Sequence, residues 1–191
     1  FGNLDLPGVS DSKTPVKSGD LVELWKIADI VDGGSMVWDV PGSAICIGDK
    51  TYFFRGSEDA LYCVTTATGK VIAKAECVSD SVYNMAIAYG DGKIFVPCRS
   101  EGYTILRVFD ADSLKQLYLS QPVSGGEVQG SIVYHEGAVY FGTYNGDYAC
   151  FSSEDVDPSI NNEEVQPLWI LEGSGWYNAT PAFAGNYCII A

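Results

Sequence analysis

The chain has 191 residues, of which 47% are hydrophobic, 13% aromatic and 19% charged, and this is the composition of a folded protein with a sizeable core. Its 21 glycines and 12 tyrosines favour short strands and tight turns over helices. The formal net charge of −14 repels nucleic acid and anionic membrane surfaces, and no apolar stretch is long enough to cross a bilayer. We therefore expect no nucleic-acid partner and no membrane insertion.

The first strand-like segment of the chain lies at residues 21–28. Its apolar run around Trp25 matches the later run around Trp169, so the two segments are predicted to have the same place in a repeated unit. It lies before the first full repeat. We therefore expect an isolated outer strand here.

Four segments further along the chain share one plan: a short strand of small residues, a tight turn, and a strand rich in β-branched or aromatic residues. They begin at Gly42, Met85, Gly130 and Thr180. The equivalent turn residues Asp49, Gly92, Gly137 and Gly185 are separated by 43, 45 and 48 residues. A period of this length with four strands per repeat is typical of a β-propeller.

Two more strand-like segments follow each of the first three pairs. Third strands are predicted at 60–65, 104–110 and 147–152, and fourth strands at 71–77, 116–122 and 167–173. Each is apolar or alternating over four to seven residues between turn signals. No segment longer than about ten residues shows the apolar period of 3.6 residues that is typical of a helix. The sequence therefore predicts an all-β fold, a β-propeller of about three and a half four-stranded antiparallel blades.

These segments are expected to form one partial propeller domain over residues 1–191. Blades are predicted at about 40–77, 84–121 and 129–173, with the isolated outer strand at 21–28 and half a blade at 178–191. In most propellers an N-terminal strand completes the last blade and closes the ring. The isolated strand at 21–28 and the half blade at 178–191 are two such unpaired ends. They predict that a ring of seven or eight blades is closed either by further blades or by self-association.

The third strand, the turn after it and the fourth strand resemble the pyrroloquinoline-quinone-type (quinoprotein-like) repeat, which reads Ala-x-Asp, then Thr-Gly-Lys, then Trp. The first blade carries the Thr-Gly-Lys turn at 68–70, and Trp25 and Trp169 stand at the Trp position. The pattern is degenerate, because Ala73 and Tyr118 replace Trp in the other two cases. The resemblance implies that Trp packs between neighbouring blades with the Thr-Gly turn docked beneath it.

The six cysteines form no CxxC motif and no adjacent pair, which argues against a metal or redox-motif site. Each lies inside an apolar strand-like run, so we expect buried free thiols, although an even number of cysteines also permits a disulfide. Cys63 and Cys150 stand at the small Ala position of the resembled repeat. The resemblance therefore implies a buried packing role for both.

Loops that lead into first strands usually meet ligands in propellers. Three of these loops combine aromatic rings with an amide or an acid: Trp38 with Asp39, Tyr83 with Asn84, and Trp176 with Tyr177 and Asn178. Such rings suit stacking on sugars or on peptide side chains. The alternative is that they pack between blades or fill the centre of the propeller.

The loops that join second to third strands carry Arg55 and Arg99 at equivalent positions. Two interpretations stay open. The guanidinium groups clamp a ligand carboxylate, or they pair with neighbouring acids such as Glu58 and Glu101.

The insertion at 152–166 carries five acidic residues, but their spacing matches no calcium loop, so we expect a solvated surface loop. His135 is the single histidine, which leaves no basis for a His-based metal site or a Ser–His–Asp triad. We therefore expect no catalytic set, no metal site and no cofactor.

Three functions remain open. The resemblance, the acidic charge and the aromatic loops favour a non-catalytic binding or scaffolding propeller of an extracytoplasmic or cell-surface bacterial protein, with a protein or carbohydrate ligand. The alternative is a dehydrogenase that depends on pyrroloquinoline quinone, but the adjacent cysteine pair and the Glu–Asn–Asp calcium set of those enzymes have no counterpart in this sequence. The third possibility is a purely structural spacer module.

Overall fold

The computed structural model describes Trp25 and residues 43–55, 58–80, 86–154, 157–160, 162–173 and 179–190. Within these ranges the chain forms β-strands and no α-helix, which confirms the predicted all-β fold. None of these residues belongs to a helix that is long and apolar enough to cross a membrane. Apart from Trp25, the expected outer strand at 21–28 lies outside the described residues.

Blade I is a four-stranded antiparallel sheet. Its strands, in the order in which they pair, are β1 (Ile45–Ile47), β2 (Lys50–Arg55), β3 (Ala60–Thr65) and β4 (Val71–Glu76). The central strand β3 is buried along almost its whole length, whereas the outer strand β4 is largely exposed. The sheet therefore runs from a buried centre to an exposed outer edge.

Blade II has the same antiparallel plan. It consists of β5 (Ala88–Gly90), β6 (Lys93–Ser100), β7 (Tyr103–Asp110) and β8 (Gln116–Ser120). Its hairpins are closed by Asp91-Gly92 and Glu101-Gly102, in which both residues have positive φ. That combination is the pattern of a two-residue type I′ turn, whose twist matches the twist of the paired strands.

The insertion at 152–166 adds a fifth strand to blade II. Strand β12 (Glu163–Val165) pairs in parallel with β8, with Glu163 opposite Tyr118. The prediction of a surface loop was therefore wrong for these three residues. The outer edge of β8 offers unpaired backbone groups, and Val165 is buried against the core between blades II and III, so both backbone pairing and apolar burial favour the strand.

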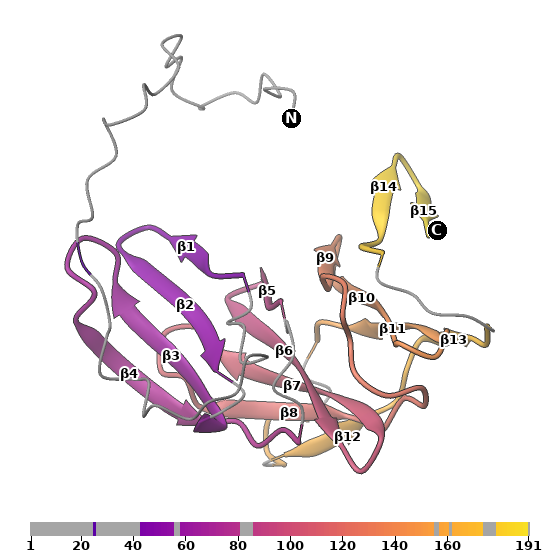
Figure 1. Cartoon of the computed structure of the whole chain (residues 1–191), viewed down its shortest axis with the longest axis horizontal. Helices are drawn as coiled ribbons and strands as arrows, with labels where there is room; N and C mark the ends of the chain where they lie inside the picture. The colour runs from indigo at the N-terminus through magenta and orange to yellow at the C-terminus, as the bar shows by residue number, and fades with distance from the viewer. Residues whose placement is uncertain are drawn as a thin grey trace, which may run out of the picture.

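Blade III and a separate hairpin complete the described fold. Blade III consists of β9 (Val133–His135), β10 (Ala138–Gly142), β11 (Tyr148–Ser152) and β13 (Trp169–Leu171), all antiparallel. Strands β14 (Ala182–Ala184) and β15 (Tyr187–Ile189) form a two-stranded antiparallel sheet of their own. The three blades lie side by side in an arc, with the short first strands β1, β5 and β9 on its inner side (Figure 1).

Two hydrophobic cores fill the spaces between the blades, because strand alternation gives blade II two different faces. Ile94, Val96 and Cys98 of β6 face blade I, where they meet Tyr52 and Phe54. The intervening Phe95, together with Leu106 and Val108, belongs to the second core. That core also holds Phe141 and Phe151 of blade III. The apolar cores therefore lie between neighbouring blades, and the packing of one blade on the next stabilises the molecule.

Buried tyrosines add a polar link at each of these interfaces. The Tyr52 hydroxyl donates to the carbonyl of Ala111 at 2.8 Å, and the Tyr118 hydroxyl donates to the carbonyl of Ser153 at 2.8 Å. Each acceptor is the first residue after the third strand of the next blade. The repeated contact fixes the position of each blade against its neighbour.

Trp25 docks on the turn that follows β3. Its indole Nε1 donates to the carbonyl of Thr66 at 2.7 Å. A Cβ atom at Gly69 would lie 2.5 Å from the indole ring, and Gly69 has a φ of +66°. This is the contact between Trp and the Thr-Gly turn that the resemblance implies. It requires glycine at position 69, because the backbone has a positive φ there and because the indole leaves no room for a side chain.

Candidate functional site

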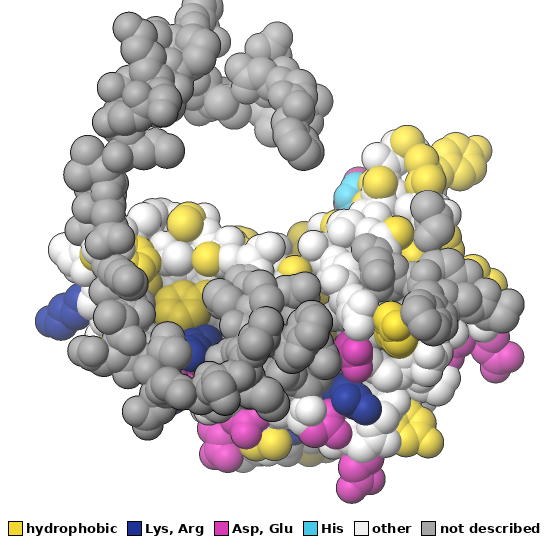
Figure 2. Space-filling model, in the orientation of Figure 1, with side chains coloured by type: hydrophobic (Ala, Val, Ile, Leu, Met, Phe, Trp, Pro, Cys, Tyr) yellow, Lys and Arg dark blue, Asp and Glu magenta, His cyan; other side chains and the backbone are white. Residues whose placement is uncertain are grey.

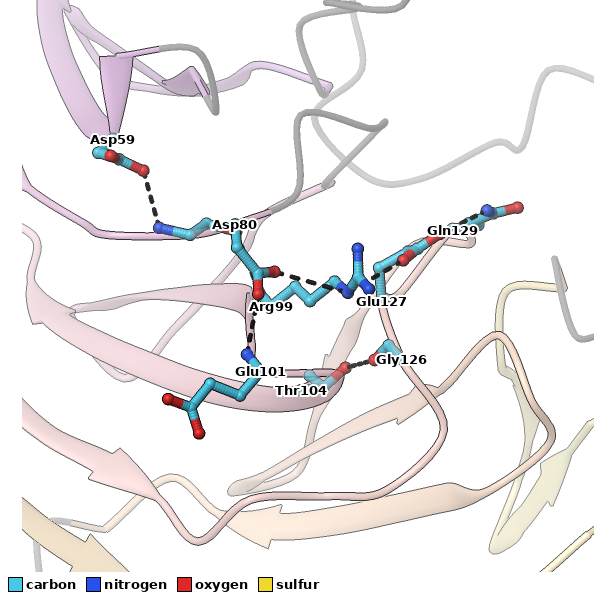
Figure 3. Close-up of polar contacts among 9 residues, drawn as sticks. Asp59, Asp80, Arg99, Glu101, Thr104, Gly126, Glu127 and Gln129 are labelled. Atoms are coloured by element: carbon cyan, nitrogen blue, oxygen red, sulfur yellow. Dashed lines mark hydrogen bonds and ion pairs between the residues drawn. The ribbon is translucent and has the colours of Figure 1, made fainter.

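A polar cluster lies where the connections between blades cross the β6–β7 hairpin (Figure 3). The backbone N–H of Ser79 donates to Asp59 Oδ1 at 2.8 Å, and that of Asp80 donates to the carbonyl of Arg99 at 2.9 Å. The Asp80 carboxylate in turn accepts from the backbone N–H of Glu101 at 2.8 Å. The connection from blade I is therefore fastened to blade II at several points.

Arg99 lies at the centre of this cluster. Its Nε is 3.5 Å from Asp80 Oδ1 and 3.6 Å from Glu127 Oε2, and Glu127 also accepts from the Gln129 side chain at 2.9 Å. Of the two open interpretations, the contacts fit pairing with acids, although the partners are Asp80 and Glu127 rather than the Glu101 carboxylate. Two carboxylates beside one guanidinium leave the cluster with net negative charge, which disfavours an anionic ligand.

Arg55, at the equivalent end of β2, lies in a similar cluster around Glu58. Its Nη1 is 3.0 Å from Glu58 Oε1, and Lys74 Nζ is 3.2 Å from Glu58 Oε2. The Tyr62 hydroxyl also donates to Glu58. Burial raises the pKa of Glu58, but hydrogen bonds from Tyr62 and Lys74 and the charge of Arg55 outweigh it, so the pKa lies below its ordinary value. The pairing with Glu58 that the sequence allowed is confirmed.

The other seven expected ligand-facing residues lie outside the described residues, and their role stays a prediction. They are Trp38, Asp39, Tyr83, Asn84, Trp176, Tyr177 and Asn178.

A cavity of about 350 Å³ lies between blade III and the β14–β15 hairpin. Strand register explains its aromatic wall: Tyr140 pairs with Cys150 and Cys150 with Trp169, which places the three side chains on one face. Phe183 of β14 faces them, with its ring 4.8 Å from that of Tyr140. The cavity is lined by His135, Glu136, Tyr140, Trp169, Phe183, Asn186 and Cys188.

The chemistry of this cavity suits binding. The His135 and Phe183 rings stack at 4.0 Å, and the Tyr140 and Trp169 rings lie 6.0 Å apart, so flat apolar surfaces surround the polar groups of Glu136 and Asn186. Burial raises the pKa of Cys188 and raises that of the neighbouring Cys150 to about 11. Both thiols are therefore protonated at neutral pH, which makes them poor nucleophiles.

The cavity was not predicted from the sequence, because all the expected ligand-facing residues lie in or beside loops. The signal that could have found it is strand alternation. Tyr140 and Trp169 lie on the face of blade III opposite to Phe141 and Phe151, which fill the core with blade II. Within the described residues this aromatic face meets the two-stranded β14–β15 hairpin and no full blade, which leaves a space that side chains do not fill.

The described part of the chain holds no cluster of three or more His, Cys, Asp or Glu side chains that could bind a metal ion. In the insertion, Asp157 accepts instead from the backbone N–H and the hydroxyl of Ser159, at 3.0 and 2.6 Å.

The arc of four-stranded antiparallel sheets, with cores between blades, defines the chain as part of a β-propeller. No protein-family model and no curated protein matches the chain. Solved structures do: BamB from Moraxella catarrhalis matches 78% of this chain with a TM-score of 0.54 at 14% identity. The computationally designed Ika4 protein matches 84% with a TM-score of 0.59 at 10% identity.

A europium-containing methanol dehydrogenase matches 69% of the chain with a TM-score of 0.51 at 15% identity. BamB and this dehydrogenase have β-propeller folds of the pyrroloquinoline-quinone-like type. The match covers 42% of BamB, 25% of the dehydrogenase and 88% of Ika4. The chain therefore spans less than half the length of the two natural propellers, and at these identities the likeness establishes the fold alone.

Proposed function

We propose that the chain is part of a non-catalytic binding or scaffolding β-propeller in an extracytoplasmic or cell-surface bacterial protein. The observation that carries the binding role is the aromatic-lined cavity beside blade III. Side chains fill the spaces between blades I and II and between blades II and III, whereas this third space stays partly open. The net charge of −14 favours solubility, which agrees with this proposal.

The wall of the cavity indicates the class of ligand. Aromatic faces stack on sugar rings or on apolar peptide side chains, and Glu136 and Asn186 supply hydrogen-bonding groups. The net charge of −14 disfavours polyanions. A neutral oligosaccharide or a neutral to basic peptide is therefore the proposed ligand.

The test is a screen of the 191-residue chain against an array of neutral oligosaccharides and a library of short peptides. A compound that binds is then titrated against the Trp169→Ala variant. Loss of a stacking wall is expected to weaken binding roughly tenfold or more. Ile160→Ala, which changes an exposed residue in the insertion, is the matched control and is expected to bind normally. Unchanged affinity in Trp169→Ala would contradict the cavity as the site, and no binding at all would favour the structural spacer.

The alternative dehydrogenase role has a direct test. Pyrroloquinoline quinone and Ca²⁺ are added together to the chain, binding is followed by calorimetry and absorbance, and methanol oxidation is assayed with an artificial electron acceptor. We expect neither stoichiometric binding nor turnover. Stoichiometric retention of the quinone would overturn the non-catalytic proposal.

A further inference from the structure

Two buried cysteines meet across the interface between blades I and II. Cys77 follows the last residue of β4, and Cys98 lies on β6. Their sulfur atoms are 3.1 Å apart, and the residues are 0% and 1% exposed. Both belong to the hydrophobic core that joins the two blades.

The environment of this pair differs from that of the other cysteines. Cys46 Sγ lies 3.3 Å from the Thr51 hydroxyl, and Cys63 and Cys150 are hydrogen-bonded to the hydroxyls of Tyr52 and Tyr140. Those three thiols have a hydroxyl partner, whereas Cys77 and Cys98 have each other. A disulfide bond is about 2.05 Å long, so joining these two sulfurs needs a movement of only about 1 Å.

We propose that Cys77 and Cys98 form a disulfide that joins blade I to blade II when the protein matures in an oxidising compartment. In the reaction the two thiols lose two protons and two electrons. The oxidant is a disulfide such as glutathione disulfide, which accepts the electrons and leaves as two molecules of glutathione. This inference concerns assembly of the blades and does not depend on the proposed ligand.

The structure also indicates when the bond forms. Burial, together with the hydrogen bond to Cys98, raises the pKa of Cys77 well above its ordinary value, so little thiolate exists once the core has closed. No oxidant reaches two sulfurs that are this deeply buried. The bond therefore forms while the chain is still folding, before blades I and II close on each other, and it is afterwards protected from reductants.

The experiment is to refold the 191-residue chain in a glutathione redox buffer and to map its peptides without reduction. The expected product is a cross-linked peptide pair that contains Cys77 and Cys98 and is lighter by two hydrogen atoms than the two separate peptides. Closing the segment between the two cysteines restricts the unfolded chain. The oxidised protein is therefore expected to melt roughly 6–12 °C above the reduced protein.

Matched variants separate this bond from other thiol chemistry. The double variant Cys63→Ala/Cys150→Ala is expected to keep the difference in melting temperature between oxidised and reduced protein. Cys77→Ala/Cys98→Ala is expected to lose it. If Cys77 and Cys98 are both alkylated in denaturant after oxidative refolding, or if either is linked to a different cysteine, the inference is wrong. The peptide map of the unchanged chain decides this even where a variant fails to fold.

Discussion

At the scale of single residues, the contact of Trp25 with Gly69 makes the turn after β3 intolerant of any side chain. In Gly69→Ala, the positive φ costs about 1–2 kcal/mol, and the overlap of the methyl group with the indole adds roughly 1–3 kcal/mol. Gly48→Ala is the matched control, because Gly48 has a φ of +60° but no atom within 4 Å of the position that the new methyl group would take. Urea unfolding should show the larger loss at Gly69, and equal losses would contradict the docking of Trp25.

The cysteines give a second prediction at this scale. In the folded protein, a thiol reagent at neutral pH should label the exposed Cys46 rapidly and should leave Cys63 and Cys150 unlabelled. Burial raises the pKa of both buried thiols, that of Cys150 to about 11, so access and ionisation both oppose the reaction. Labelling in denaturant is the control. Mass spectrometry that found Cys150 labelled as fast as Cys46, or Cys63 in a disulfide, would contradict the prediction.

Some of these residues could be predicted from the sequence and others could not. The structure confirms buried free thiols at Cys63 and Cys150, which stand at the small position of the repeat. The expectation of burial was wrong for Cys46 and only partly right for Cys188. Ile45 and Ile47 pack on the core. Because successive side chains of a strand point to opposite faces, Cys46 between them points away from the core. An apolar run three residues long does not reveal which face is buried.

At the scale of elements, Asp110 organises the turn from β7 to β8. Its Oδ1 accepts from the backbone N–H and the hydroxyl of Ser113, at 2.7 and 2.6 Å. These hydrogen bonds lower the pKa of Asp110 below its ordinary value. A lowered pKa in the folded state stabilises the fold above about pH 4, the unfolded value, and this stability is lost as the pH falls through the folded value.

We therefore expect Asp110→Asn to be less stable than the unchanged chain at pH 7, by less than about 1 kcal/mol because the turn is partly solvated. The difference should shrink towards zero below about pH 3. Urea unfolding at several pH values measures it. Ser113→Ala should cause a similar loss at pH 7 that does not add to the first. A difference between Asp110→Asn and the unchanged chain that stayed constant from pH 7 to pH 3 would contradict the role of the ionised carboxylate.

The regular strands could be predicted well from the sequence, because each has an apolar or alternating run of residues bounded by turn signals. The third strands β3, β7 and β11 were placed to within one residue at each end. Strand β12 was missed because its residues Glu163, Glu164 and Val165 have no strand-like pattern of their own. Their pairing depends on the exposed edge of β8, which comes from tertiary structure. The aromatic cavity was missed for the same reason, since it depends on how blade III meets the β14–β15 hairpin.

At the scale of the whole molecule, apolar side chains are exposed at the end formed by β13 and β15, and hydrophobic surface is visible on the β14–β15 hairpin (Figure 2). We call this surface the open flank; it comprises Trp169, Leu171, Tyr187 and Ile189, whereas Leu168 and Ile170 alternate with Trp169 and Leu171 and so lie on the other face of β13. Tyr187 is 77% exposed and Ile189 is 54% exposed. Contiguous patches above a few hundred Å² are rare on monomeric proteins. Covering about 400 Å² of such surface would contribute on the order of 10 kcal/mol, as an upper value.

We therefore expect the 191-residue chain to self-associate at micromolar concentration, with a weight-average mass in sedimentation velocity that rises with concentration. Leu171→Ser/Tyr187→Ser should weaken association because it removes two apolar side chains from the open flank. The matched control is Ile160→Ser, which changes a residue of 49% exposure in the insertion and should associate normally. A stable monomer of the unchanged chain over this concentration range would contradict the prediction.

The parallel pairing of β12 with β8 also bears on the order in which the protein folds during synthesis. Blade II has emerged by Ser120, but its fifth strand ends only at Val165, after most of blade III has been made. At roughly 5–20 residues per second, the edge of β8 stays unpaired on the nascent chain for about 2–9 s. During that interval the edge is available to chaperones, or to the same edge of a neighbouring nascent chain. Blades II and III should therefore complete their folding as one cooperative unit, later than blade I.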